Sequence, residues 1–187
     1  MYFRAADRCY LLLYVDDVLI AASKMSVIDS VREMLTAKWQ WSDIGSATFI
    51  LGFKIERNPE SREIRLSQSA YVRGLLERFG MEGANAVATP VENFTLVKAD
   101  PFDSDRATPK ELRAFNEQRS LYQSIVGSVM WCAVSTRADL GFAAGYLSRL
   151  NSNPTAEHLK APKRVLTYLK GTLGPGLVFG LKSINDI

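Results

Sequence analysis

Two adjacent carboxylates, Asp16 and Asp17, are the strongest chemical signal in this sequence. They interrupt the apolar stretch CYLLLYVDDVLIAAS, which runs from Cys9 to Ser23. An unpaired carboxylate is costly to bury, and two neighbouring carboxylates also repel each other. The pair is therefore expected either at a solvent-exposed turn or beside a cation.

A hairpin turn would allow both carboxylates to serve one site, whereas adjacent residues on a regular strand point to opposite faces. There they could bind Mg²⁺ or Mn²⁺, since hard divalent cations prefer oxygen ligands. Such a site suits phosphoryl transfer that uses two metal ions. The dipeptide by itself favours a simpler interpretation, an ordinary solvated turn, because aspartate is common at hairpin tips.

The surrounding residues predict the elements that would position this pair. Residues 10–22 read as two short strands joined at the two aspartates. A helix follows, for which Ser26 and Asp29 resemble a capping box. Residues 49–57 and 63–66 are predicted to be strands on either side of a turn.

Helices dominate the rest of the expected structure. Ser67 or Ser69 could cap a helix that runs to Phe79, with Gly80 as its stop. Residues 81–108 are loop-like. Three further helices are expected at residues 112–134, 137–150 and 154–170. Asn153 would cap the last of these, and Pro162 would lie about two turns inside it, at a cost of roughly 3 kcal/mol. These elements predict an α+β fold.

Composition narrows the class of protein. The chain has 187 residues, of which 47% are hydrophobic and 23% charged, as in ordinary globular proteins. The formal net charge of +3 is only a weak indication of an acidic partner. Cys9 and Cys132 are expected to be buried thiols, and His158, the only histidine, is expected to be a surface or packing residue. The longest uncharged stretch, residues 120–136, reads as a buried helix, so no membrane span is expected.

A basic stripe is predicted on the final helix. Lys160, Lys163 and Arg164, together with Lys170, fall near one side of it. Such a stripe could follow the phosphate backbone of a nucleic acid without reading its sequence. It could equally be the solvated face of an amphipathic helix.

An ordered series of motifs resembles the copia-type retrotransposon reverse transcriptases, which are RNA-directed DNA polymerases. The series covers residues 9–172 and consists of LLLYVDDVLIAAS, DIGSATFILGFKI, IRLSQSAYVRGLLERFGM, TPVE, YQSIVGSVMW, TRADLGFAAGYLSRL and HLKAPKRVLTYLKGT. The resemblance implies that Asp16 and Asp17 help to hold two Mg²⁺ or Mn²⁺ ions. It also implies that Tyr14 and Val15 lie against the primer terminus.

The resemblance further implies a division of the chain. Residues 1–60 would be the C-terminal part of a polymerase palm, formed by the YVDD hairpin, a helix and a primer-grip-like hairpin that includes Leu51, Gly52 and Lys54. Residues 61–108 would include the start of the thumb and a linker, and residues 109–187 an all-helical thumb and connection region. The alternative for the stretch around Gly52 is a plain core strand in which this glycine permits close backbone approach.

The same resemblance predicts that the chain alone is inactive. A palm needs a further carboxylate from an earlier strand, and Asp7 would lie about 30 Å from Asp16 along an extended strand. Asp29 and Asp43 could reach the site only by special folding. Ala138 and Leu159 also depart from the family pattern, in which proline and tryptophan are usual.

Partners and alternatives follow from this interpretation. The parent enzyme would bind an RNA or DNA template-primer duplex and deoxynucleotides inside the cell, in the cytoplasm, a virus-like particle or the nucleus. An exposed sheet edge predicts self-association. The alternatives are a non-catalytic nucleic-acid-binding module, which Asp16→Asn would leave unaffected, and a functionless pseudogene product.

Overall fold

The computed structural model describes residues 2–4, 6, 8–92 and 99–180. The chain divides into two compact units, Met1–Ile50 and Leu51–Ile187, and each is described by itself. The described elements are helices and two small antiparallel sheets, so the α+β class predicted from the sequence is confirmed.

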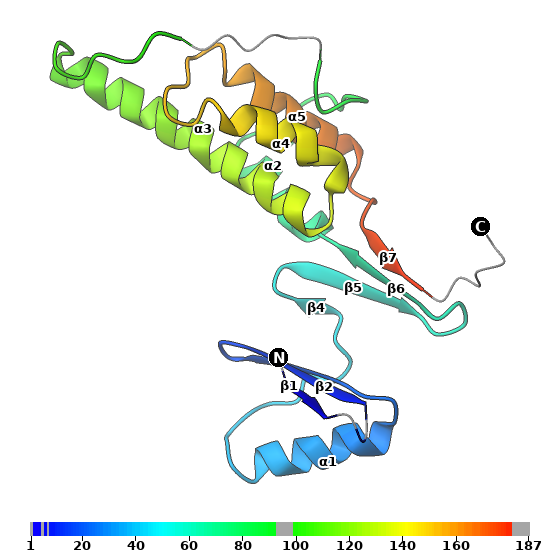
Figure 1. Cartoon of the computed structure of the whole chain (residues 1–187). Helices are drawn as coiled ribbons and strands as arrows, with labels where there is room; N and C mark the ends of the chain where they lie inside the picture. The colour runs from blue at the N-terminus through cyan, green and yellow to red at the C-terminus, as the bar shows by residue number, and fades with distance from the viewer. Residues whose placement is uncertain (1, 5, 7, 93–98, 181–187) are drawn as a thin grey trace. The chain divides into compact units, whose positions relative to one another are not determined.

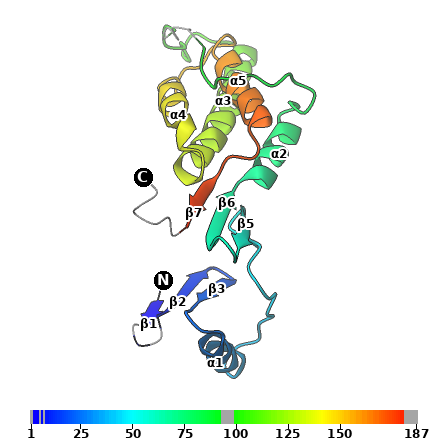
Figure 2. The ribbon, with the colours of Figure 1, turned by 90° about the vertical axis from the view of Figure 1, so that its right-hand side faces the viewer.

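The first unit is built on a three-stranded sheet in the order β1-β2-β3. Its elements are β1 (Tyr2–Arg4), β2 (Cys9–Tyr14), β3 (Asp17–Ala21), α1 (Met25–Thr36) and β4 (Phe49–Ile50). Helix α1 lies along one side of this sheet (Figures 1 and 2). The predicted hairpin is confirmed, because β2 and β3 pair from Tyr10 and Ala21 to the turn. The cap predicted at Ser26 is wrong: α1 begins one residue earlier, and Lys24 at the N-cap position makes no side-chain cap.

The second unit contains a sheet whose last strand comes from the far end of the chain. Strands β5 (Phe53–Asn58), β6 (Glu63–Ser67) and β7 (Leu177–Phe179) are hydrogen-bonded in that order. Figure 2 shows β7 beside β6. A Cβ atom at Gly176 would lie 2.2 Å from the carbonyl oxygen of Leu66, so only glycine permits this approach of the two backbones. The single strand predicted for residues 49–57 is wrong in one respect, because a turn at residues 51–52 interrupts it.

Helices form the core of the second unit. They are α2 (Ser69–Arg78), α3 (Pro109–Ser135), the short 3₁₀ helix η2 (Ala138–Leu140), α4 (Gly141–Ser148) and α5 (Lys160–Gly171). Figures 1 and 2 show α3, α4 and α5 packed side by side. Their buried apolar side chains meet in one cluster that includes Val72, Leu76, Tyr122, Ile125, Val129, Leu140, Leu147, Val165 and Leu169. This cluster, rather than either sheet, provides most of the buried apolar surface.

Local sequence signals set the start of α3 and the end of α2. Helix α3 begins with a complete capping box between Thr108 and Glu111, with Pro109 at the first helical position. Gly80, at φ +64°, follows the last turn of α2 as predicted. The cap predicted from Ser67 or Ser69 is wrong, because Gln68 occupies the N-cap position of α2 without a side-chain cap.

The last helix begins six residues later than predicted. Helix α5 starts at Lys160, so Pro162 lies in its first turn, where no intrahelical N–H bond is lost. The cost predicted for Pro162 is therefore wrong. Asn153 does not cap this helix; its side-chain amide donates to the carbonyl oxygens of Ala99 and Asp100 and accepts from the N–H of Phe102. It thereby ties the loop before α3 to the loop before α5.

The cysteines and the histidine have the packing roles expected of them. Cys9 and Cys132 are both buried free thiols, and burial raises the pKa of Cys132 to about 11. His158 is buried, and its Nδ1 accepts a hydrogen bond from the backbone N–H of Thr155. The hydroxyl of Thr155 accepts in turn from the N–H of His158. This reciprocal pair organises the turn that leads into α5.

Candidate metal-binding hairpin

The two carboxylates lie at the tip of the β2–β3 hairpin. Tyr14 is the last residue of β2 and pairs with Asp17, the first residue of β3. The loop therefore consists of only Val15 and Asp16. Since residues paired across two strands project from the same face, Tyr14 and Asp17 stand side by side, and Asp16 lies directly beside them in the turn.

Val15 adopts a backbone conformation that valine rarely takes. Its φ angle is +50°, in the left-handed region, and its side chain is 79% exposed. A β-branched residue is a genuine outlier there, and such strain costs of the order of 1–3 kcal/mol. A tight hairpin turn needs a positive φ at this position, where glycine is usual. The two-residue turn therefore holds Val15 in a strained conformation at the exposed tip.

Both carboxylates face solvent, so the chain avoids the cost of burying an unpaired carboxylate. Asp16 and Asp17 are exposed. Two adjacent oxygen donors at an open turn fit Mg²⁺, which proteins commonly hold through one or two carboxylates together with substrate phosphates. Within the described part of the chain, no group of three or more histidine, cysteine, aspartate or glutamate side chains is placed to hold a metal ion.

The other aspartates considered for this site have different surroundings. Arg32 forms ion pairs with both Asp29, at 3.1 Å, and Asp43, at 2.8 Å. The Asp43 carboxylate also accepts a hydrogen bond from the N–H of Gly45. Asp29 therefore pairs within α1, whereas Asp43 ties the segment after α1 to this helix. Asp7, the remaining candidate, lies outside the described residues.

The predicted primer-grip segment begins with a tight turn. Leu51 and Gly52 both have positive φ angles, +51° and +84°. No atom lies within 4 Å of a Cβ built on Gly52, so the alternative in which this glycine permits close backbone approach in a core strand is wrong. Lys54, on β5, pairs with Glu56 at 2.7 Å, and this hydrogen bond lowers the pKa of the Glu56 carboxyl.

The basic residues of α5 differ in how they are engaged. Lys160 pairs with Glu157 at 2.7 Å. Arg164 is directed to the loop before α3, where it pairs with Glu92 at 3.4 Å and donates to Thr89. Lys170 donates to the backbone carbonyls of Glu82 and Ala84. Of the four side chains, only that of Lys163 is exposed and makes no hydrogen bond or ion pair within the described residues.

A buried arginine network is the feature that the sequence did not reveal. The guanidinium of Arg137, 3% exposed, makes two hydrogen bonds to Asp139, at 2.9 and 2.7 Å, and two to Thr172. Tyr168 donates to the same carboxylate at 2.8 Å. The bonds from Arg137 lower the pKa of the Asp139 carboxyl. The network joins η2 to the end of α5. The sequence Arg137-Ala138-Asp139 could have indicated the ion pair, because it places the two opposite charges two residues apart.

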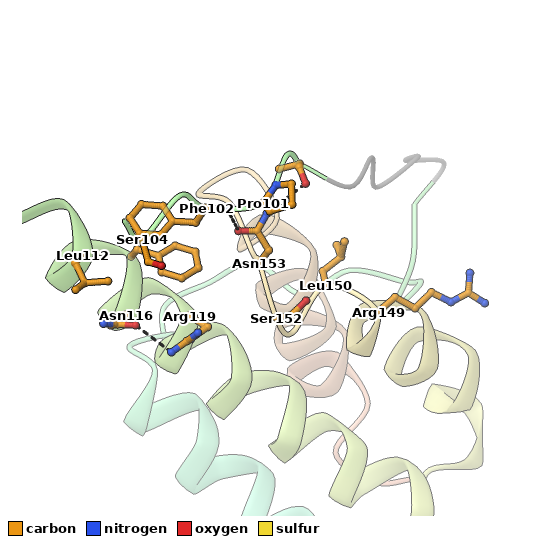
Figure 3. Close-up of a pocket in the computed structure, with 12 residues that line it drawn as sticks. Pro101, Phe102, Ser104, Leu112, Asn116, Arg119, Arg149, Leu150, Ser152 and Asn153 are labelled. Carbon is orange, nitrogen blue, oxygen red and sulfur yellow. Dashed lines mark hydrogen bonds between the residues drawn. The ribbon is translucent and has the colours of Figure 1, made fainter. Parts of the chain in front are cut away.

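An open cavity lies near the start of α3. Its volume is about 510 Å³, and its lining includes Phe102, Phe115, Asn116, Arg119 and Asn153 (Figure 3). The rings of Phe102 and Phe115 are stacked with centroids 4.2 Å apart, and Arg119 lies over the Phe115 ring. The two rings contact each other, and the side-chain amides of Asn116 and Asn153 are already hydrogen-bonded within the fold. We therefore interpret the cavity as a space between packed segments.

Among the described residues, none of the helices combines the length and the apolar character that crossing a membrane requires.

Comparison with known sequences identifies the class of protein that this chain resembles. Residues 1–93 match the family model described as reverse transcriptase (RNA-dependent DNA polymerase). No solved structure gave a significant match.

Several of the relatives are transposon proteins. The chain is 39% identical over 171 residues to a retrovirus-related Pol polyprotein from transposon TNT 1-94 of Nicotiana tabacum. It is 33% identical over 175 residues to the corresponding polyprotein from transposon RE1 of Arabidopsis thaliana, and 30% identical over 174 residues to a Ty5-1 transposon protein of Saccharomyces cerevisiae.

These alignments cover 91%, 93% and 92% of this chain, but only 12%, 11% and 53% of the respective relatives. The chain belongs to the reverse transcriptase family of copia-type retrotransposon polyproteins. The resemblance stated from the motifs is thereby confirmed.

Proposed function

We propose that Asp16 and Asp17 bind Mg²⁺ or Mn²⁺ as part of a nucleotidyl-transfer site for template-directed DNA synthesis. The observation that carries this proposal is the hairpin tip, where two adjacent exposed carboxylates follow a valine at φ +50°. Membership of the reverse transcriptase family supports it further.

In this proposal each residue of the tip has a role. The carboxylates of Asp16 and Asp17 supply oxygen ligands, and bound metal ions would lower the charge barrier between a primer 3′-hydroxyl and the α-phosphate of a deoxynucleotide. Tyr14, paired with Asp17 across the hairpin, and Val15 would lie against the primer terminus. A further carboxylate must complete the site, so we expect this chain alone to be inactive.

The remaining segments complete the proposal. Residues 1–60 would form the end of the palm, residues 61–108 the start of the thumb and a linker, and residues 109–187 the helical thumb and connection region. Leu51, Gly52 and Lys54 would contact the primer. A template-primer duplex would lie beside Lys160, Lys163 and Arg164. Because Arg164 is already paired with Glu92, we expect it to contribute least to duplex binding. Family membership favours an intracellular setting, and the uncharged strand β7 at the edge of its sheet favours weak self-association.

Metal binding can be tested directly on the purified chain. Mn²⁺ would be titrated and its bound fraction followed by electron paramagnetic resonance, with wild type compared with Asp16→Asn. Asp105→Asn, which removes an exposed carboxylate in the other unit, is the matched control. We expect Asp16→Asn to weaken binding and the control to leave it unchanged. Equal binding by all three proteins would overturn the proposal.

Primer extension on an RNA template tests the expectation of inactivity. We expect no extension by either wild type or Asp16→Asn. Extension that depends on Asp16 would support the metal site and refute the incomplete-site argument. Absence of Mn²⁺ binding, together with duplex binding that Asp16→Asn does not alter, would instead favour a non-catalytic binding module. Absence of a cooperative thermal transition would favour a pseudogene product.

A further inference from the structure

The exposed face of α4 carries a stack of two aromatic rings and one arginine. Phe142, Tyr146 and Arg149 are spaced i, i+4 and i+7, which places them on one face of the helix and its end. The rings of Phe142 and Tyr146 are nearly parallel, at 9°, with centroids 5.8 Å apart. The guanidinium of Arg149 lies 5.8 Å from the centroid of the Tyr146 ring. The three groups therefore form one continuous stack.

The stack ends in an exposed aromatic ring. Phe142 is 73% exposed, although phenylalanine usually lies inside a fold. A Cβ atom added at Gly141 or at Gly145 would meet nothing within 4 Å, so the surface beside the stack is open. The core does not use the Phe142 ring, and one of its faces is available to another flat group.

The chain segment that carries the stack is positively charged. Arg149 is the only charged residue between Leu140 and Ala156. Its side chain points away from the other labelled side chains in Figure 3. The nearest acidic residue in the sequence, Asp139, is engaged by Arg137 and Tyr168. A partner that offers flat rings and negative charge therefore complements this surface better than an acidic or purely aliphatic one.

We propose that this surface, formed by Phe142, Tyr146 and Arg149, binds single-stranded nucleic acid. One base would stack on the outer face of Phe142 and extend the stack, and a nearby phosphate would pair with Arg149. Stacking accepts any base, so binding would show little sequence preference. The inference deepens the proposed function, because it names a place where an unpaired template segment would be held.

Fluorescence anisotropy with a labelled oligodeoxythymidylate tests this surface. The assay buffer would contain a chelator and no divalent cations, so that metal binding by Asp16 and Asp17 does not affect the result. We expect Phe142→Ala to weaken binding by about 5- to 150-fold with no change in salt dependence. Arg149→Gln should lower the slope of log affinity against log salt by about 0.7, the value for one phosphate contact on a single strand.

Val134→Ala is the matched control, because Val134 is 70% exposed and its side chain carries no ring. Phe142→Ala and Arg149→Gln are on the surface, and circular dichroism melting would verify that they fold. Binding by Phe142→Ala equal to that of the control would overturn the proposal and leave the surface to a protein partner. An unchanged salt slope in Arg149→Gln would refute the phosphate contact. Neither result would alter the Mn²⁺ titration, so the two proposals fail separately.

Discussion

Asp139→Asn should destabilise the second unit far more than an ordinary surface substitution. The change is nearly isosteric and removes only the negative charge and one acceptor. It leaves the guanidinium of Arg137, 3% exposed, without a counter-charge and places an N–H₂ group where the carboxylate accepted bonds from Arg137 and Tyr168. The hydrogen bonds from Arg137 to Thr172 remain.

The size of the effect follows from burial. Breaking a fully buried ion pair by removing one partner costs about 3–5 kcal/mol, because a buried charge is left uncompensated. The Asp139 side chain is 41% exposed, so solvent screens part of this interaction, and Arg137 keeps its bonds to Thr172. We therefore expect a loss of about 2–3 kcal/mol. For a unit of this size the melting temperature should fall by about 4–12 °C.

Thermal melting followed by circular dichroism would measure this loss, with Asp103→Asn as the control. Asp103 also pairs with an arginine, Arg106, but at 3.6 Å and with both side chains largely exposed. Asparagine retains the oxygen that accepts from the backbone N–H groups of Asp105 and Arg106. The control should therefore change the stability by less than about 0.5 kcal/mol. Equal losses in the two variants would refute the reasoning.

The pH dependence gives a second check on the same substitution. The pKa of the Asp139 carboxyl is lowered in the folded protein by its bonds from Arg137. Its contribution is therefore present above the ordinary aspartate pKa of about 3.9 and is lost as the pH falls through the lowered value. The difference between wild type and Asp139→Asn should shrink in acid. A difference that stays constant well below pH ~3.9 would assign the effect to packing instead.

Two further predictions concern other parts of the second unit. Gly176→Ala should separate β7 from β6, because the new Cβ would lie 2.2 Å from the carbonyl oxygen of Leu66. Amide hydrogen exchange in β6 should then become faster. An unchanged exchange rate would contradict the close approach of the two strands. Tyr122→Phe should cost about 1–2 kcal/mol at neutral pH through the lost hydrogen bond from its buried hydroxyl. Burial raises the pKa of Tyr122 to about 12, so wild type should lose more stability than the variant as the pH rises from about 10 toward 12. Denaturant titrations should therefore show the two proteins converging.

Local signals in the sequence determined the elements and their chemistry. Continuous apolar runs on each side of Asp16 and Asp17 predicted the hairpin, and the ordered motifs identified the family. Helix signals were reliable where they depended on the local backbone alone: Gly80 ends α2 because glycine adopts a positive φ without strain. The capping box at Thr108 is equally local and could have been found from the letters TPKE.

Tertiary structure decided the features that depend on partners distant in the sequence. Asn153 would cap a helix by its local pattern, but its amide binds the loop at Ala99 and Asp100 instead, and α5 begins only at Lys160. Arg164 belongs to a basic stripe by spacing, yet it pairs with Glu92. Strand β7 exists only because Gly176 reaches β6 across more than a hundred residues. Spacing fixes the face of an element on which a side chain lies, whereas its partner depends on which segments the folded core brings together.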